Sequence, residues 1–187
     1  MRKVVAGLYM SLDGVVEDRS TWGSSYFNKE MLEMIREGTA EADAVLIGRR
    51  TYEAFADFWP KQGSDVPMSD FLNNSPKYVL STTLKTVAWK NSTLHKGDLS
   101  EVVAELKARP GKNIQVPGSP RLVRTLMQLG LLDALSLFVI PIVLGKGMRL
   151  FEEVTREVPL ELVASTSFST GVVGVTYRPK RNDGAPR

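Results

Sequence analysis

Short apolar runs alternate with amphipathic stretches along most of the chain. The runs are too short for helices and end at turn residues, a pattern that favours buried strands. We assign strands to residues 4–10, 44–47, 78–80, 93–95 and 114–116. Repeated strand-then-helix units predict a mainly parallel sheet with helices on both faces, because each parallel connection has to cross over the sheet.

The amphipathic stretches carry start and stop signals for helices. Cap-type residues precede them, and glycine or proline follows. We expect helices to begin after Asn28, Gly48, Asp98 and Ser119 and to end near Gly38, Pro60, Pro110 and Gly130. The stretch 63–74 is polar and rich in turn residues, so the sequence predicts a loop there.

The end of the chain follows a different pattern. Residues 135–144 are strand-like with a break at Pro141. Two further strand-like segments, 160–167 and 172–177, flank Gly171. This order predicts an antiparallel C-terminal hairpin added to the parallel sheet.

Length and composition agree with one globular domain. The chain has 187 residues, of which 43% are hydrophobic and 24% charged, and the sequence shows no internal repeat or linker. We expect one α/β domain over residues 1–179 and a disordered polar tail over 180–187. No segment reaches the roughly 20 apolar residues that a membrane helix needs, so no membrane partner is predicted.

The residue counts exclude several kinds of chemistry. The absence of cysteine excludes disulfides, thiolate nucleophiles and iron–sulfur clusters, and it fits a reducing cytoplasm. The single histidine, His95, leaves no basis for a multi-histidine metal site, so we expect no metal. The 24 basic residues are scattered against 21 acidic ones, which argues against a nucleic-acid partner.

Candidate binding residues follow three of the predicted strands. Gly48-Arg49-Arg50-Thr51 places two cations at a helix start, which the helix dipole disfavours unless an anion neutralises them. Ser81-Thr82 supplies hydroxyls after the third strand, and Gly118-Ser119 lets backbone approach a ligand at the next helix start. Each segment also has a simpler interpretation when taken alone. Arg49 and Arg50 would be solvated, Ser81-Thr82 would be an ordinary loop, and Gly118-Ser119 would be a helix cap. Together they favour a dinucleotide, whose phosphates span neighbouring strand ends.

The standard nucleotide-binding motifs are missing. Gly145-x-Gly147 lacks the third glycine of the dinucleotide fingerprint, because Leu150 stands in its place, and the chain has no Walker sequence. A Rossmann domain and a P-loop enzyme are therefore not expected.

The motifs and their order resemble the dihydrofolate reductase superfamily, and in particular its branch related to the reductase domain of the bifunctional riboflavin-biosynthesis deaminase/reductase. The segments that carry the resemblance are 11–14, 48–53, 80–83, 116–119, 132–133 and 141–151. The resemblance covers about residues 4–177 and implies a dihydrofolate-reductase-like fold with NADPH as the hydride donor. The cofactor-binding residues that it implies are Gly48, Arg49, Arg50 and Thr51 at the phosphates, Ser81 and Thr82 at the 2'-phosphoribose and adenine, and Gly118 and Ser119 at the pyrophosphate.

The substrate side departs from the family pattern. Dihydrofolate reductases carry an acid on the first helix inside the pocket, whereas the inward stripe of that helix here is apolar and no glutamate is matched to that position. Asp13 is the best remaining acid, either as a catalytic residue that supplies or relays a proton or as a turn aspartate. Candidate substrate-binding aromatic residues, for which the core is the alternative place, are Trp22, Tyr26, Phe27 and Trp59.

These observations lead to one expected function and one alternative. We expect an NADPH-dependent reductase that transfers a hydride to a small heterocycle, pterin-like or riboflavin-precursor-like, or to a carbonyl substrate. The alternative is a catalytically idle nucleotide-binding or interaction protein that kept the fold. A homodimer is also expected, because the 135–144 strand and the late strands around Gly171 would otherwise leave an exposed sheet edge.

Overall fold

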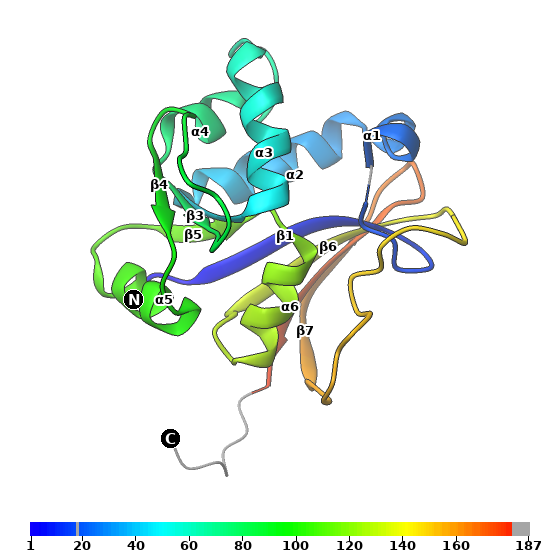
Figure 1. Ribbon diagram of the computed structural model, residues 1–187. Helices are drawn as coiled ribbons and strands as arrows, with labels where there is room; N and C mark the ends of the chain where they lie inside the picture. Colours follow the sequence, from blue (N-terminus) through cyan, green and yellow to red (C-terminus); the bar gives the residue numbers. More distant parts are fainter. Residues whose placement is uncertain (18, 181–187) are drawn as a thin grey trace.

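The computed structural model describes residues 1–17 and 19–180, and this part of the chain folds around an eight-stranded sheet (Figure 1). The strand order across the sheet is β4-β3-β2-β5-β1-β6-β8-β7. The strands are β1 (Val4–Ser11), β2 (Ala42–Gly48), β3 (Lys77–Leu80), β4 (Ser92–His95), β5 (Asn113–Val116), β6 (Ala134–Ile140), β7 (Leu160–Ser167) and β8 (Val173–Pro179).

The sheet has a parallel part and an antiparallel part. Strands β1 to β6 all run parallel to one another, whereas β8 is antiparallel to β6 and β7 is antiparallel to β8. The predicted fold class, a mainly parallel sheet with an antiparallel C-terminal hairpin, is confirmed.

Helices cover both faces of the sheet, as predicted. On one face, α5 and α6 pack on the largest hydrophobic cluster, and on the other face lie α2, α3 and α4 (Figure 1). The helices are α1 (Arg19–Trp22), α2 (Lys29–Ala40), α3 (Arg49–Phe58), α4 (Ser69–Asn74), α5 (Leu99–Ala108) and α6 (Pro120–Gln128), with short 3-10 turns η1 (Ser24–Tyr26) and η2 (Trp59–Lys61).

The central strand β2 shows why the apolar runs form strands. Ala44 and Leu46 point into the cluster under α5 and α6, and Val45 and Ile47 point into the cluster under α3 and α4. All four side chains are at most 1% exposed. A strand covered on both faces needs apolar side chains at every position, which is why the run is continuous rather than alternating.

Two local predictions are wrong, the end of one helix and the assignment of one loop. Helix α2 continues past Gly38 to Ala40, because Gly38 lies on the exposed side of the helix with no atom near its Cβ position, and a single exposed glycine costs a helix only about 1 kcal/mol. The expected loop 63–74 contains α4 (Ser69–Asn74). Its sequence is polar, but Leu72 is completely buried and Ser69 Oγ donates to Gln62 O, so tertiary contacts hold the helix.

The free edge beside the C-terminal hairpin is β7, and β6 lies inside the sheet between β1 and β8. Seven of the eight residues of β7 are exposed. The backbone N–H of Lys180 donates to Pro159 O, and residues 181–187 of the expected tail lie outside the described residues. Within 1–17 and 19–180, none of the helices combines the length and apolar character needed to cross a membrane.

Candidate active site

The carboxyl ends of β3, β2 and β5 meet at one edge of the sheet, because these parallel strands are neighbours. There the backbones after β2 and β5 touch, with Gly48 N–H donating to Gly118 O at 3.2 Å. A Cβ on Gly48 would lie 2.6 Å from Ser119 Oγ, and a Cβ on Gly118, whose φ is +144°, would lie 2.8 Å from Thr51 Oγ1. The structure therefore brings Gly48, Thr51, Gly118 and Ser119 together, and the peptide between Gly118 and Ser119 is cis.

Two helices begin at this edge without side-chain caps. Gly48 is the N-cap of α3 and Ser119 is the N-cap of α6, and neither makes a side-chain hydrogen bond to the first turn. The N–H groups in the first turn of α3 therefore have no side-chain partner, and the same holds in α6 from Arg121 onward, because Pro120 at its first position has no N–H. Such free N–H groups at a helix start attract anions.

Both predicted arginines lie at the start of α3 and are exposed. Arg49 Nη1 is 3.4 Å from both carboxylate oxygens of Glu53 one turn later, which is a weak exposed pair. Arg50 forms no ion pair with another described residue. Neither guanidinium therefore makes a buried contact that the fold depends on.

The hydroxyl of Ser81 is already used within its own turn. Ser81 Oγ accepts hydrogen bonds from the amides of Thr83 and Leu84 at 3.2 and 3.0 Å, and Thr82 beside it is exposed. Because β3 borders β2, this turn lies next to the start of α3. Ser81 uses its lone pairs within the turn and its hydroxyl lies 3.3 Å from Thr83 Oγ1, whereas the Thr82 hydroxyl is exposed.

Asp13 follows β1 and is saturated with hydrogen bonds. Its Oδ1 accepts from Ser11 Oγ at 2.7 Å and from Leu144 N at 3.1 Å, its Oδ2 accepts from Gly145 N at 2.9 Å, and Arg149 Nη2 lies 3.5 Å away. The Ser11 hydroxyl, followed by the two amides, lowers the pKa of Asp13 from 3.8 to about 2. Of the two roles expected for this acid, these contacts favour the turn aspartate, because a group that stays ionised at neutral pH holds no proton to give.

The four predicted substrate aromatics fall into two clusters. Trp22, Tyr26 and Phe27 pack near Met31 on the α2 side, whereas Trp59 packs near Tyr52 on the α3 side. Trp22 Nε1 donates to Glu17 O at 2.8 Å. The buried Trp59 Nε1 has no hydrogen-bond partner among the residues that the structure describes.

The acids of α2 point away from the sheet, as the sequence predicts. Glu30, Glu33 and Glu37 are exposed, while Met31 and Ile35 are buried. The face of α2 that packs on the sheet is therefore apolar.

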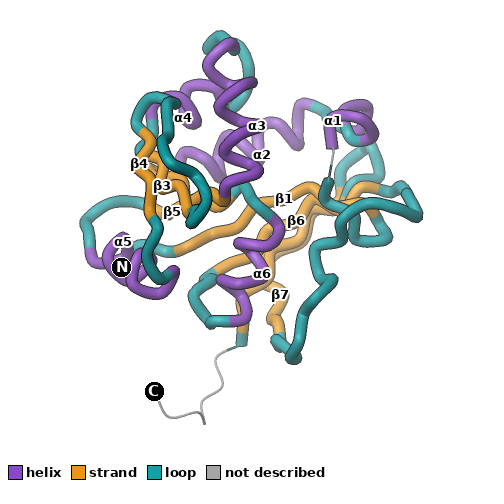
Figure 2. Tube along the Cα trace, viewed as in Figure 1, coloured by secondary structure: helices purple, strands orange, loops and turns teal. Residues whose placement is uncertain are grey.

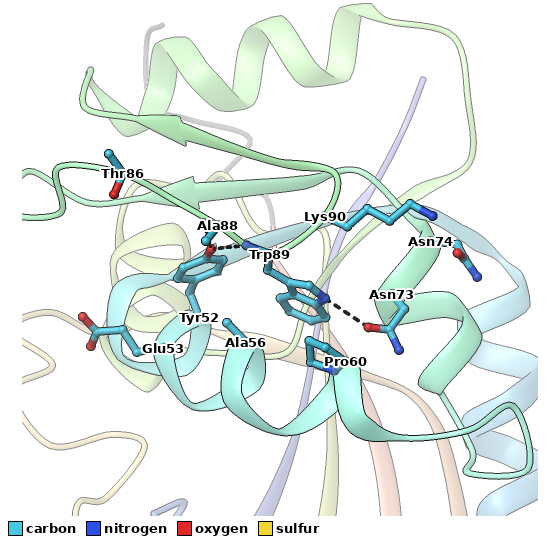
Figure 3. A pocket seen from close by; sticks show the side chains of 10 residues that line it. All are labelled: Tyr52, Glu53, Ala56, Pro60, Asn73, Asn74, Thr86, Ala88, Trp89 and Lys90. Carbon is cyan, nitrogen blue, oxygen red and sulfur yellow. Dashed lines mark hydrogen bonds between the residues drawn. The ribbon is translucent and has the colours of Figure 1, made fainter.

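A hollow of about 630 Å³ lies beside α3, and none of the predicted cofactor residues lines it (Figure 3). Hydrogen bonds join some of its lining residues: Tyr52 Oη accepts from the amides of Ala88 and Trp89, and Trp89 Nε1 donates to Asn73 Oδ1. The hollow therefore lies where α3, α4 and the β3–β4 connection pack against one another. Its lining residues are Tyr52, Glu53, Ala56, Pro60, Asn73, Asn74, Thr86, Ala88, Trp89 and Lys90.

Three cations that the structure buries were not singled out from the sequence: Arg2, which pairs with Asp43, Lys77 and Arg124. Lys77 is completely buried next to Trp89, and its Nζ donates to Leu72 O and Ser75 O at the end of α4, while burial lowers its pKa to about 8. Arg124 is 5% exposed on α6. The only signal in the sequence is a charged residue inside an otherwise apolar segment, which does not identify its partners.

Comparisons with known proteins agree with this geometry. The model of the RibD C-terminal domain family matches residues 2–174. The uncharacterized protein YyaP of Bacillus subtilis (strain 168) is 28% identical over 183 residues, which is 94% of each chain.

Solved structures share the fold. A protein assigned to riboflavin biosynthesis from Shewanella sp. PV-4 superposes with a TM-score of 0.77 at 24% identity, over 96% of this chain and 99% of that one. Dihydrofolate reductase from Enterococcus faecalis, solved with NADP(H), superposes with a TM-score of 0.66 at 16% identity, over 96% and 97%. The fold is therefore dihydrofolate-reductase-like.

Proposed function

The chain belongs to the RibD C-terminal domain family, and from that premise we propose that it is an NADPH-dependent reductase. It transfers a hydride to a small heterocycle, pterin-like or riboflavin-precursor-like, or to a carbonyl compound. One observation carries the proposal: α3 and α6 both begin without a side-chain cap, and their starts are in contact through Gly48 and Gly118. The exposed Arg49 and Arg50 lie at the same place.

The residues present fit a dinucleotide. Ser119 and Thr51 fill the space that a Cβ on Gly48 or Gly118 would need, so the two glycines let the starts of α3 and α6 pack against each other, and one diphosphate could contact both. Arg49 and Arg50 supply positive charge at the start of α3, and Thr51 and Ser119 supply hydroxyls at the same point. Thr82, with Ser81 shaping its turn, lies toward the 2'-phosphoribose. NADPH, when bound, supplies the hydride, and the protein binds, orients and excludes water.

We propose that solvent supplies the proton that completes the reduction. Asp13 is an anion at neutral pH because its pKa is about 2. The apolar side of α2 offers no other acid. We assign Asp13 to holding the loop after β1 in place, and the aromatics Trp22, Tyr26 and Phe27 to the substrate side of that loop. Trp59 packs in the separate cluster under α3, so we do not assign it to the substrate.

Single-turnover oxidation of bound NADPH tests the proposal. The protein is saturated with NADPH and mixed with pterins, pyrimidine precursors of riboflavin, flavins and small carbonyls, and absorbance of the reduced nicotinamide is followed. We expect oxidation with at least one of these classes. Binding without oxidation across the panel would favour the idle nucleotide-binding protein, and absence of NADPH binding would reject both.

Cofactor choice is a second test. NADPH should bind more tightly than NADH, because Arg49, Arg50 and the Ser81-Thr82 turn favour an additional phosphate and no acid at these positions selects a free 2'-hydroxyl. Calorimetric titration of the two cofactors measures the difference. Equal affinities would remove these residues from the 2'-phosphate site.

We also propose that the chain acts as a cytoplasmic homodimer. Strand β7 leaves a free sheet edge with Leu162 and Val163 53% and 58% exposed. Soluble proteins cover or charge such edges, and a second copy would cover this one. Light scattering at micromolar concentration should give a mass near twice 20.7 kDa, and a mass of one chain would reject the dimer.

A further inference from the structure

The segment 142–153, which we call the strap, follows β6 without forming a helix or strand (teal in Figure 2). It lies against the loop 12–17 that follows β1, and an isolated antiparallel bridge joins Val15 to Arg149. Backbone hydrogen bonds link the two segments at Leu12 N to Ile142 O, Val16 N to Met148 O, and Leu150 N to Gly14 O, at 2.8 to 3.0 Å.

Side chains of the loop complete this attachment. Asp13 accepts from the amides of Leu144 and Gly145, and Glu17 Oε2 accepts from Met148 N at 3.0 Å. The carbonyl of Glu17 in turn accepts from the Trp22 indole. The position of Trp22, on the proposed substrate side, thus depends on where the strap holds the loop.

The strap is fixed from its other side by Arg124 of α6. The guanidinium is 7% exposed, and Nη1 donates to Arg149 O at 3.0 Å and to Leu150 O at 3.5 Å, while Nη2 donates to Glu153 Oε2 at 3.0 Å. Glu152 lies 3.8 Å from Nη1. One planar cation therefore satisfies two consecutive strap carbonyls, which an irregular segment cannot satisfy by itself.

Arg124 and the proposed cofactor residues stand on the same short helix. Ser119 is the N-cap of α6, and Arg124 lies just over one turn further along. A continuous series of contacts runs from α6 through Arg124 to Arg149 of the strap, and from there to Asp13, whose backbone carbonyl accepts from Arg149 Nε at 3.1 Å.

We propose that Arg124 is a positioning residue, which holds the loop 12–17 and Trp22 in place relative to the start of α6 by clamping the strap. Its effect on the loop stands on the apo structure alone. Its effect on a bound ligand rests on the proposed function, because it requires NADPH at the start of α6.

Hydrogen exchange of individual amides, followed by NMR on the full chain, tests the clamp without any ligand. Arg124→Met removes the donors but keeps an apolar stem of similar length. We expect exchange at Leu144, Gly145, Met148 and Val16 to accelerate about tenfold or more, because opening of the strap exposes all four amides together. The Trp22 indole N–H should accelerate with them.

Gln128→Ala is the matched control. Gln128 is also on α6, and its Nε2 donates to Thr155 Oγ1 at 3.3 Å, beyond the strap, so its removal should leave the four amides unchanged. Acceleration in Arg124→Met that is confined to residues 149–153, or that is equal over β1 and β5, would overturn the proposal. If Arg124→Met does not fold, Arg124→Lys gives the same comparison, because a lysine keeps the charge but its single Nζ cannot contact the strap carbonyls and Glu153 together, as Nη1 and Nη2 of the arginine do.

Addition of NADPH separates this inference from the proposed function. We expect NADPH to slow exchange of the loop 12–17 in the natural chain and to have little effect on that loop in Arg124→Met. Equal slowing in both would overturn the link between α6 and the loop. If NADPH does not bind the natural chain, the proposed function fails, and the apo comparison still decides whether Arg124 clamps the strap.

Discussion

The starts of α3 and α6 and the loop after β1 lie at the same edge of the sheet, yet they use their polar groups in opposite ways. At the helix starts the first amides have no side-chain caps, and Arg50 forms no ion pair with a described residue. In the loop, Asp13 accepts one hydroxyl and two amide hydrogen bonds, and Glu17 accepts another amide.

This difference separates binding residues from residues that hold the fold. A polar group that the fold already satisfies gains little from a ligand, whereas an uncapped helix start gains several hydrogen bonds from an anion. Substitutions in the open region should therefore change NADPH affinity strongly, and substitutions in the loop should change the fold instead.

Gly118→Ala should have the largest effect on NADPH affinity. The added Cβ would lie 2.8 Å from Thr51 Oγ1, and φ of +144° is a backbone conformation that alanine rarely adopts, so the contact between the two strand ends has to open. We expect affinity to fall by about 100-fold or more in a calorimetric titration. Gly38→Ala is the control, because nothing lies near its Cβ position, and it should leave affinity unchanged and raise stability by up to about 1 kcal/mol.

Arg50→Ala and Arg49→Ala should have the next largest effect. Each removes a charge-assisted hydrogen bond to phosphate, so NADPH should bind about 1.5 to 3 kcal/mol more weakly, while the thermal midpoint without cofactor stays the same. Arg36→Ala is a matched control, since Arg36 is an exposed arginine paired with Glu33 on a different helix, α2. Unchanged affinity in both α3 variants would mean that these arginines are only solvated, and the contrast between the two regions would disappear.

In this protein the sequence predicts the individual strands and helices better than it predicts which strands pair with each other. Apolar runs such as 44–47 identify strands because full burial demands apolar side chains, and Asn28 identifies the start of α2 because its side chain accepts from Met31 N. The order of the strands and the exposed position of β7 depend on tertiary pairing, which no local pattern contains. Helix α4 was missed for the same reason, because burial of Leu72 rather than helix propensity maintains it.

The same limit divides the candidate site. The positions of Gly48 and Gly118 could be predicted, because a close backbone approach requires glycine and both stand at strand ends: Gly48 is the last residue of β2, and Gly118 stands two residues after β5. The role of Asp13 could not, because its amide partners Leu144 and Gly145 stand 131 and 132 residues away. The role of Arg124 could not be predicted either, because its partners lie on the strap, an irregular segment whose position against α6 no sequence pattern indicates.

Asp13→Asn should have the smallest effect on NADPH affinity, and it sharpens the comparison through pH. The pKa of Asp13 is about 2 in the fold against an ordinary 3.8, so its contribution to stability is fully present above about pH 4 and is lost as the pH falls toward 2. Urea unfolding of the natural chain should show this acid-dependent loss, and the variant should show a smaller one. The loss that remains comes from other carboxylates whose pKa the fold lowers, such as those of Glu33 and Glu161.

The kinetics of the same variant decide whether Asp13 also acts on the substrate. An asparagine amide cannot accept hydrogen bonds at both atoms, so one of the amides of Leu144 and Gly145 loses its acceptor and the strap loosens, which we expect to lower the single-turnover rate by less than about tenfold with an unchanged pH profile. Loss of a general acid would instead lower that rate by about 100-fold or more and alter its dependence on pH. That second result would place Asp13 in the open, ligand-facing region and remove the distinction between the two regions.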